Sequence, residues 1–238
     1  MTVNTAFKFV KTIAALALLT IAPGCEMLGF REWTWHQKLN VSVTTPAGVK
    51  SDHSVFRVWV EFTPKWWGLG DAAGAANSSW RGEAVVVDVG AGRYLFALIK
   101  GYEPSIAAKI FFPEEMRNLR RVEDLDSVYD KVSSLRATKS VPKEFYPILL
   151  TFDDVRNPLT VRRVDPDNLA TTFGKGFSLS DISLTITDEP VTMGKISTVL
   201  DWLDEYYGKY LDGSDIESLS AVDRLANSLG SDSFNTEK

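Results

Sequence analysis

Few side chains in this sequence have the chemistry of a catalytic or metal-binding group. His36 and His53 are the only histidines, and Cys25 is the only cysteine. Their spacing matches no zinc motif and leaves no cysteine–histidine pair for nucleophilic catalysis. A serine–histidine–acid triad would need one of the two histidines, and no G-x-S-x-G sequence accompanies them. The sequence therefore predicts no metal site and no cofactor.

Two adjacent carboxylates, Asp153 and Asp154, are the remaining candidates for catalysis. Arg162 and Arg163 follow closely and could hold an acid pair of the kind that glycoside hydrolysis requires. Aspartate is also an ordinary turn residue, and adjacent side chains in a turn seldom point into one cleft. We therefore expect a protein that is not an enzyme, with an acid-catalysed hydrolase as the least favoured alternative.

Three tryptophans are the candidate ligand-binding residues: Trp66, Trp67 and Trp80. They lie in a stretch from Pro64 onward that has no periodicity, and long stretches of this kind are often functional. Indole rings can stack on a sugar or lie against a lipid headgroup. The favoured interpretation is nevertheless that Trp66 and Trp67 fold back over the edge of a sheet, because exposed paired tryptophans would form a sticky apolar patch.

Alternating apolar and polar residues predict the strands that would position these side chains. Residues 33–43 and 56–63 alternate with a period of two and are separated by a turn at Pro46-Ala47-Gly48, which predicts an antiparallel pair. Residues 83–89 and 93–99 flank Gly90-Ala91-Gly92 and predict a second hairpin. Further strands are expected at residues 147–152, 159–164 and 182–187.

Apolar residues at helical spacing predict helices in the middle and at the end of the chain. The expected helices are at residues 105–112, from Pro113 onward, at 125–135, between Asp165 and Gly174, and at 193–211. A last helix is expected at 214–229, since Ser214-Asp215-Ile216-Glu217 has the form of a capping box. The polar residues from Gly230 onward predict a frayed end.

The N-terminus has the features of an export signal. Lys8 and Lys11 precede an apolar run at residues 12–22. A helix needs about twenty apolar residues to span a bilayer, so a run of about eleven matches a secretory signal peptide better. Cys25 follows directly, and an unpaired cysteine in an exported protein requires an explanation.

The position of Cys25 suggests that it is modified with lipid. Ala22-Pro23-Gly24-Cys25 resembles a bacterial lipobox, in which the cysteine is acylated and becomes the mature N-terminus. Gly24 fits this pattern, whereas Ala22 and Pro23 depart from its usual residues. Glu26 follows Cys25 directly, at the position where an aspartate would signal retention in the inner membrane. The sequence therefore resembles lipoproteins of the outer-membrane class. The alternative is an ordinary signal peptide and a soluble periplasmic protein.

Composition and charge limit the remaining possibilities. A chain of 238 residues with 45% hydrophobic content can bury a sizeable core, as one domain or as two. The formal net charge of -5 argues against binding to nucleic acid, which requires a basic face. Early strands, middle helices and mixed later elements predict an α+β fold: an antiparallel sheet built from hairpins, packed against amphipathic helices on one face.

Together these features predict an order of segments along the chain. We expect a signal peptide at residues 1–24, a lipid-anchored linker at 25–32, an α+β globular domain at 33–212, and a C-terminal helix with a frayed tail at 213–238. The limits of these segments follow from Cys25, from the first predicted strand and from the end of the predicted helix at Asp212-Gly213.

Four segments resemble a family of uncharacterised proteobacterial exported proteins with a lipoprotein-type signal peptide. They are G-E-A-V-V-V-D at residues 82–88, T-F-D-D at 151–154, V-R-R-V-D-P at 161–166 and I-T-D-E-P-V-T at 186–192. The resemblance covers roughly residues 33–203. It implies export and assigns no activity.

The sequence as a whole predicts a lipid-anchored protein of the bacterial cell envelope that faces the periplasm and acts by binding or as a structural component. Its expected partners are the membrane, through the lipid on Cys25, and cell-wall polysaccharide or another envelope protein. The alternative function is a carbohydrate- or peptidoglycan-binding module that uses Trp66, Trp67 and Trp80.

Overall fold

The computed structural model describes residues 29–64, 66–67, 76–100, 102, 105–120 and 124–236. The chain divides into two compact units: Met1–Trp33 with Val60–Ser78, and Thr34–Trp59 with Ser79–Lys238. Two long strands, β1 (Arg31–Thr45) and β2 (Gly48–Phe62), contribute residues to both units. None of the described helices combines the length and the apolar character that crossing a membrane requires.

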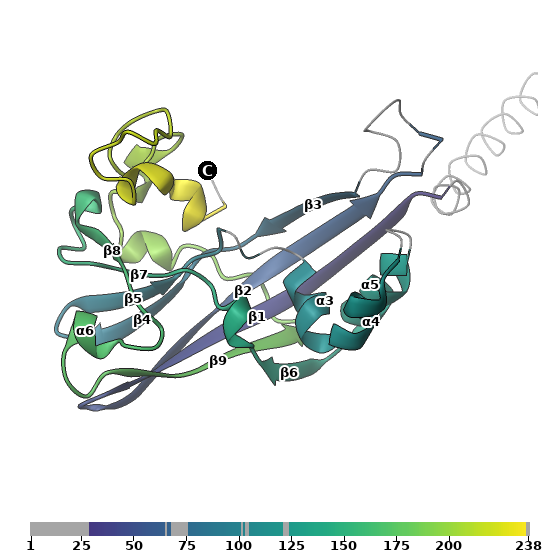
Figure 1. Cartoon of the computed structure of the whole chain (residues 1–238), viewed down its shortest axis with the longest axis horizontal. Helices are drawn as coiled ribbons and strands as arrows, with labels where there is room; N and C mark the ends of the chain where they lie inside the picture. Colours follow the sequence, from purple (N-terminus) through teal and green to yellow (C-terminus); the bar gives the residue numbers. More distant parts are fainter. Residues whose placement is uncertain are drawn as a thin grey trace, which may run out of the picture. The chain divides into compact units, whose positions relative to one another are not determined.

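The larger sheet has five antiparallel strands in the order β3-β2-β1-β9-β6 (Figure 1). The strands added to β1 and β2 are β3 (Ala76–Arg81), β6 (Ala137–Ser140) and β9 (Ser178–Thr187). A two-residue turn at Pro46 and Ala47 joins β1 to β2, which confirms the first predicted hairpin. Strand β9 returns from far along the chain and pairs with β1 on one side and β6 on the other.

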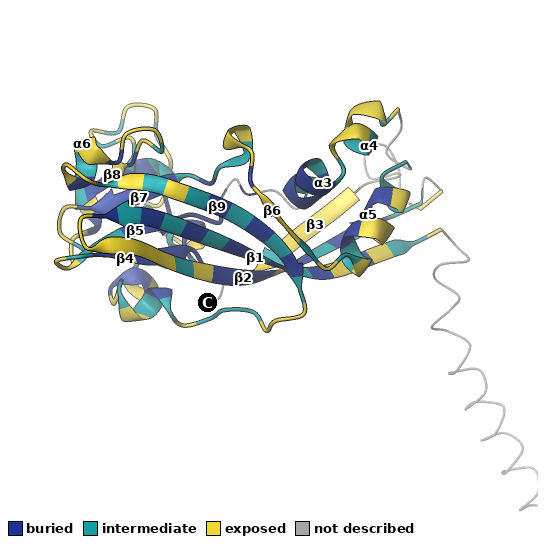
Figure 2. Cartoon of the chain, turned by 90° about the horizontal axis from the view of Figure 1, so that it is seen from below, coloured by how far each residue is buried: buried dark blue, intermediate teal, exposed yellow. Residues whose placement is uncertain are grey.

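Period-two alternation separates a buried face of this sheet from a polar one. Every second residue of β1 is buried, while the residues between them are partly or fully exposed (Figure 2). Three helices lie in the middle of the chain: α3 (Ser105–Phe111), α4 (Pro113–Asn118) and α5 (Leu125–Ser134). The ring of Tyr129 in α5 stacks on that of Trp35 in β1, with centroids 5.7 Å apart. The three middle helices are therefore confirmed, and α5 covers the buried face.

A second sheet has four antiparallel strands in the order β4-β5-β7-β8. Its strands are β4 (Val85–Gly90), β5 (Arg93–Ala97), β7 (Leu149–Phe152) and β8 (Val161–Arg163). The predicted hairpin at residues 90–92 is confirmed. The α+β class with antiparallel sheets is likewise confirmed, although the strands form two sheets where the sequence suggested one.

The two long helices predicted in the last fifty residues are wrong. Residues 193–211 contain only the 3₁₀ turns η5 (Ile196–Thr198) and η6 (Leu203–Tyr206), and Gly208 takes a positive φ of 71°. Residues 214–229 contain only η7 (Ala226–Ser228). The apolar residues with helical spacing do not form one stripe here. Successive turns direct them separately into the core of the four-stranded sheet. The members of that core from this region are Ile196, Leu200, Trp202, Leu203, Leu211, Ala226 and Leu229.

The predicted frayed end is also wrong over the described residues. Phe234 is fully buried, and its ring lies 6.2 Å from that of Phe96 and 6.1 Å from that of Phe152. Thr236 donates its backbone N–H to the carbonyl of Gly82 at 3.1 Å. The polar composition of this segment does not predict that the end of the chain is anchored, because only one phenylalanine and backbone hydrogen bonds hold it in place.

Smaller elements connect these parts. Between the predicted limits of Asp165 and Gly174 the helix α6 spans only Ala170–Phe173, because Asp165 Oδ1 instead accepts the N–H of Asp167 and closes a turn. The remaining short elements are η3 (Lys143–Phe145), η4 (Pro158–Thr160) and η8 (Ser231–Ser233).

Candidate functional site

Trp66 and Trp67 form an exposed aromatic cluster with Phe30 in the first unit. The ring of Phe30 lies edge-on to both, with centroids 5.8 and 5.3 Å away, and the two indoles are 5.8 Å apart. Trp67 donates its backbone N–H to the carbonyl of Pro64 at 2.9 Å, which makes the turn that presents both rings. The exposed fractions are 59% for Trp66 and 55% for Trp67. The favoured prediction that these tryptophans are covered is therefore wrong.

A second candidate is a groove of about 370 Å³ between β2 and β3 in the second unit. Its lining residues are Arg57, Trp59, Ser79, Trp80 and Arg81. Arg57 and Trp59 project from the polar face of β2, because the alternate residues of that strand are buried. Strand β3 is the edge strand of its sheet, so this side of the groove is open to ligands.

The groove combines aromatic rings with cationic groups. An indole offers a flat face for stacking on a sugar ring, and guanidinium groups bind carboxylates in a bidentate manner. Arg57 has no ion-pair partner among the residues that the structure describes. The arrangement suits an anionic saccharide better than a neutral one.

Of the three predicted tryptophans, the structure places only Trp80 in this groove. Trp66 and Trp67 belong to the other unit and do not line this groove. Trp59 and Arg57 were missed as candidates. The available signal was the alternation of β2, which puts both on the exposed face of a strand.

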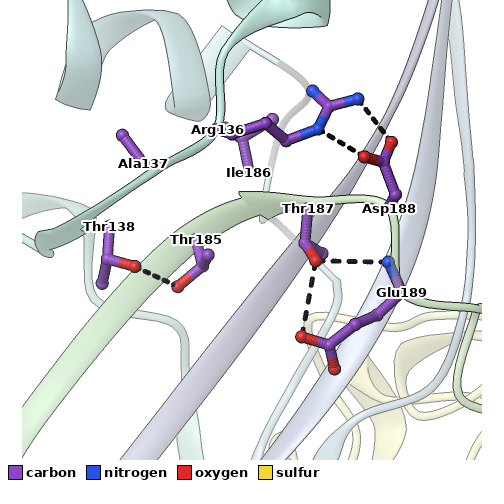
Figure 3. Close-up of a pocket in the computed structure, with 8 residues that line it drawn as sticks. All are labelled: Arg136, Ala137, Thr138, Thr185, Ile186, Thr187, Asp188 and Glu189. Carbon is purple, nitrogen blue, oxygen red and sulfur yellow. Dashed lines mark hydrogen bonds and ion pairs between the residues drawn. The ribbon is translucent and has the colours of Figure 1, made fainter.

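A hollow of about 560 Å³ lies along β9 and β6 (Figure 3). Its polar side chains bind one another: the guanidinium of Arg136 pairs with the carboxylate of Asp188, and Nε donates to Oδ2 at 2.7 Å. The hydroxyls of Thr138 and Thr185 are 2.8 Å apart across the two strands. The Arg136 hydrogen bond also lowers the pKa of Asp188. Because these groups are already satisfied, this hollow is the weaker candidate.

His36 binds the segment of the chain that follows β9. Its Nδ1 donates to the carbonyl of Glu189 at 2.7 Å, and Lys38 forms an ion pair with the Glu189 carboxylate. The hydrogen bond from Lys38 lowers the pKa of Glu189. Further on, Thr192 donates its N–H to the carbonyl of Val55 at 2.9 Å. These contacts fix the segment after β9 against β1 and β2.

Asp153 and Asp154 lie in the turn between β7 and β8. Asp153 pairs with Arg162 at 3.0 Å, whereas Asp154 accepts the backbone N–H of Arg156 at 3.0 Å and pairs with its side chain at 3.4 Å. The backbone N–H bond lowers the pKa of Asp154. Both carboxylates are exposed, and each has a different arginine. This geometry is that of a turn.

The remaining predictions concern metal binding and the lipid on Cys25. No group of three or more histidine, cysteine or carboxylate side chains capable of holding a metal ion occurs within the described ranges. Cys25 and the expected signal peptide lie outside the residues that the structure describes.

Comparison with known proteins gives no relative: no family model, no curated protein and no solved structure matches this chain.

Proposed function

We propose that this chain is a lipid-anchored protein of the bacterial cell envelope that acts by binding. The observation that carries the proposal is the position of the aromatic cluster Phe30–Trp66–Trp67. Phe30 lies five residues after Cys25. Five residues of extended chain span at most about 18 Å. Acyl chains on Cys25 would therefore hold the cluster close to the lipid headgroups.

Exposed tryptophans are well suited to that environment. Indole rings concentrate at the membrane–water interface, where the apolar ring and its N–H group both find suitable surroundings. In water, by contrast, two exposed indoles beside a phenylalanine form a sticky apolar patch. The lipid would supply stable attachment when two or more acyl chains are present, without a transmembrane helix.

The proposal is tested first at Cys25. We expect mass spectrometry of the mature protein to show an acylated Cys25 at its N-terminus, and Cys25→Ala to move the protein from the membrane fraction to the soluble fraction. An unmodified Cys25 in a freely soluble protein contradicts the proposal.

The cluster itself is tested with lipids that carry bromine in their acyl chains, because bromine quenches nearby indoles. We expect quenching of the lipidated protein in such vesicles, and its loss in a Trp66→Phe/Trp67→Phe variant that still sediments with membranes. A Trp59→Phe variant is the matched control and should leave the quenching unchanged. Equal quenching in both variants contradicts the role of the cluster.

A second function, binding of an anionic cell-wall saccharide, is favoured by the groove of Arg57, Trp59, Trp80 and Arg81. Peptidoglycan fragments with free carboxylates are suitable ligands, to be measured by isothermal titration calorimetry. Loss of a stacked aromatic ring or of a charged hydrogen bond removes about 1–3 kcal/mol, so Trp59→Ala and Arg57→Gln should each weaken binding about tenfold.

The controls for the groove lie elsewhere on the chain. Trp67→Ala removes an exposed indole, and Arg156→Gln removes an exposed guanidinium, but neither residue lines the groove. Both should bind with unchanged affinity. No heat of binding at millimolar ligand, or equal effects of all four variants, would dispose of the saccharide function.

A further inference from the structure

The segment at residues 211–226 forms a closed surface loop. Leu211 donates its backbone N–H to the carbonyl of Ala226 at 3.1 Å and to that of Leu229 at 2.8 Å. Next to this neck, Tyr210 and Gly230 form an antiparallel bridge. Compact loops with joined ends are often functional. We call this segment the 211–226 loop.

The interior of the 211–226 loop is polar. The side-chain nitrogen of Asn227, a residue only 2% exposed, lies 2.9 Å from Asp212 Oδ2, 2.7 Å from Ser214 Oγ and 3.1 Å from the carbonyl of Ile216. Its side-chain oxygen accepts the backbone N–H of Ser218 at 2.6 Å. One buried amide therefore fixes four positions of the loop.

The exterior of the loop carries three large apolar side chains. Ile216, Leu219 and Val222 have exposed fractions of 75%, 83% and 107%. Ordinary loops turn such side chains inward and leave asparagine and serine in water. Here the distribution is inverted: the hydrogen bonds of Asn227 keep the backbone in shape, and the three large apolar side chains contribute nothing to the core.

We propose that the 211–226 loop is a docking surface for a protein partner whose apolar groove is rimmed by lysine or arginine side chains. The apolar part of the partner follows from Ile216, Leu219 and Val222. Its charge follows from the two exposed carboxylates beside them, Asp215 and Glu217, against the exposed guanidinium of Arg224. Complementary charges at the rim of an interface set the choice of partner and the rate of association.

The same charges disfavour the other two occupants of an apolar surface. Segments that lie on anionic membranes are rich in lysine and arginine on their polar face, whereas this loop is acidic. In a two-fold dimer the same patch faces itself, so the carboxylates of one loop would oppose those of the other. The inference is independent of the lipid anchor and of the groove at Trp59.

The preformed state of the loop is part of the inference. A surface that is ordered before binding loses less conformational entropy when the partner arrives. Asn227 thus acts as a positioning residue: its amide holds the backbone from which the three apolar side chains project, although it contacts no partner itself.

The test uses the full-length protein with a photo-crosslinking residue, p-benzoylphenylalanine, at position 219, irradiated in cells that produce it. We expect one protein adduct, reduced about tenfold by Ile216→Ser/Val222→Ser and by Asp215→Lys/Glu217→Lys. The crosslinked peptide of the partner should contain apolar residues flanked by lysine or arginine. Val49→Ser and Leu159→Ser, which change exposed apolar residues outside the loop, should leave the adduct yield unchanged.

Three further measurements keep the outcome decisive. The serine and lysine variants concern exposed side chains, so their thermal unfolding should match that of the unchanged protein, and any loss of adduct then reflects the surface. Asn227→Ala should lower the yield although all three apolar residues remain. Absence of an adduct, an adduct with a second copy of the chain, insensitivity to the charge reversals, or loop-dependent flotation with phosphatidylcholine–phosphatidylglycerol vesicles would each overturn the proposal.

Discussion

The carboxylate of Glu83 accepts the backbone N–H of Ile196 at 3.1 Å, although the two residues are 113 positions apart in the chain. The N–H of Lys195 donates to both oxygens of the same carboxylate at 3.0 Å. Glu83 is fully buried, and a buried charge is tolerated only when hydrogen bonds replace its water. This contact connects the segment after β9 to the start of β4.

Removal of the Glu83 carboxylate should destabilise the protein. Glu83→Ala removes the acceptor of the buried Ile196 N–H and of the half-buried Lys195 N–H, and we expect the free energy of unfolding to fall by about 2–3 kcal/mol. Glu83→Gln keeps one acceptor oxygen and should lose less. Urea denaturation measures both, with Glu217→Ala as a control at an exposed glutamate. Equal stability of the Ala variant and the unchanged protein contradicts the role given to this contact.

The aromatic contacts of Phe234 predict that the end of the chain is needed for stability. Phe234→Ala removes a fully buried ring from the core that includes Phe96 and Phe152, and we expect a loss of about 3–5 kcal/mol. Leu159→Ala, at an exposed position, should change the stability by less than about 0.5 kcal/mol. A calorimetric scan of the two variants side by side checks this, and similar midpoints for both would refute it.

The turn between β4 and β5 offers a stabilising substitution. Ala91 has a φ of 57° and Gly92 a φ of 70°, so both central residues of the turn take the left-handed conformation. Asparagine tolerates this conformation better than alanine, and Asn-Gly is the preferred pair for such hairpin turns. We expect Ala91→Asn to raise the free energy of unfolding by about 0.5–1 kcal/mol. A lower unfolding midpoint would show that the turn differs from this description.

Stability in acid should depend on Asp212. Hydrogen bonds, first from the Ser214 hydroxyl and then from the Ser214 backbone and Asn227, lower the pKa of this carboxyl. A carboxyl with a lowered pKa stabilises the folded state above its unfolded pKa, about 3.9 for aspartate, and loses that contribution as the pH falls through the folded value.

The unfolding midpoints of the unchanged protein and Asp212→Asn measure this contribution. Their difference should be constant above about pH 5 and should shrink below about pH 4. Ser214→Ala removes the main cause of the shift and should reduce the effect. A difference that does not vary down to pH 2 would contradict the assignment.

Local elements could be predicted from the sequence because their causes are local. Alternation identified β1 and β2, and two β-rich runs around Gly90-Ala91-Gly92 identified β4, β5 and the turn between them. The apolar stripe of α5, with Val128, Tyr129 and Val132 buried, likewise follows from helical spacing alone. Each of β1, β2 and α5 buries one face, so the period of its apolar residues reports its structure.

The later part of the chain could not be predicted in this way, because contacts with residues far away in the sequence determine its structure. Leu200 and Leu211 belong to one apolar pattern with helical spacing, and Leu229 belongs to another. Each of them nevertheless packs into the core of the four-stranded sheet from a separate turn. The sequence predicts Glu83 only as a strand residue, and its hydrogen bond from the N–H of Ile196 is known only from the structure. The same limit applies to the candidate sites. Trp59 lines a groove only because β3 lies beside β2, and this pairing could not be predicted from the sequence.

The burial of Phe234 has a consequence for biogenesis. The second unit cannot complete its core until residue 234 has left the ribosome, so translation of nearly the whole described chain precedes final folding. Until then Phe96 and Phe152 lack one of their aromatic neighbours, and the core of the four-stranded sheet stays incomplete.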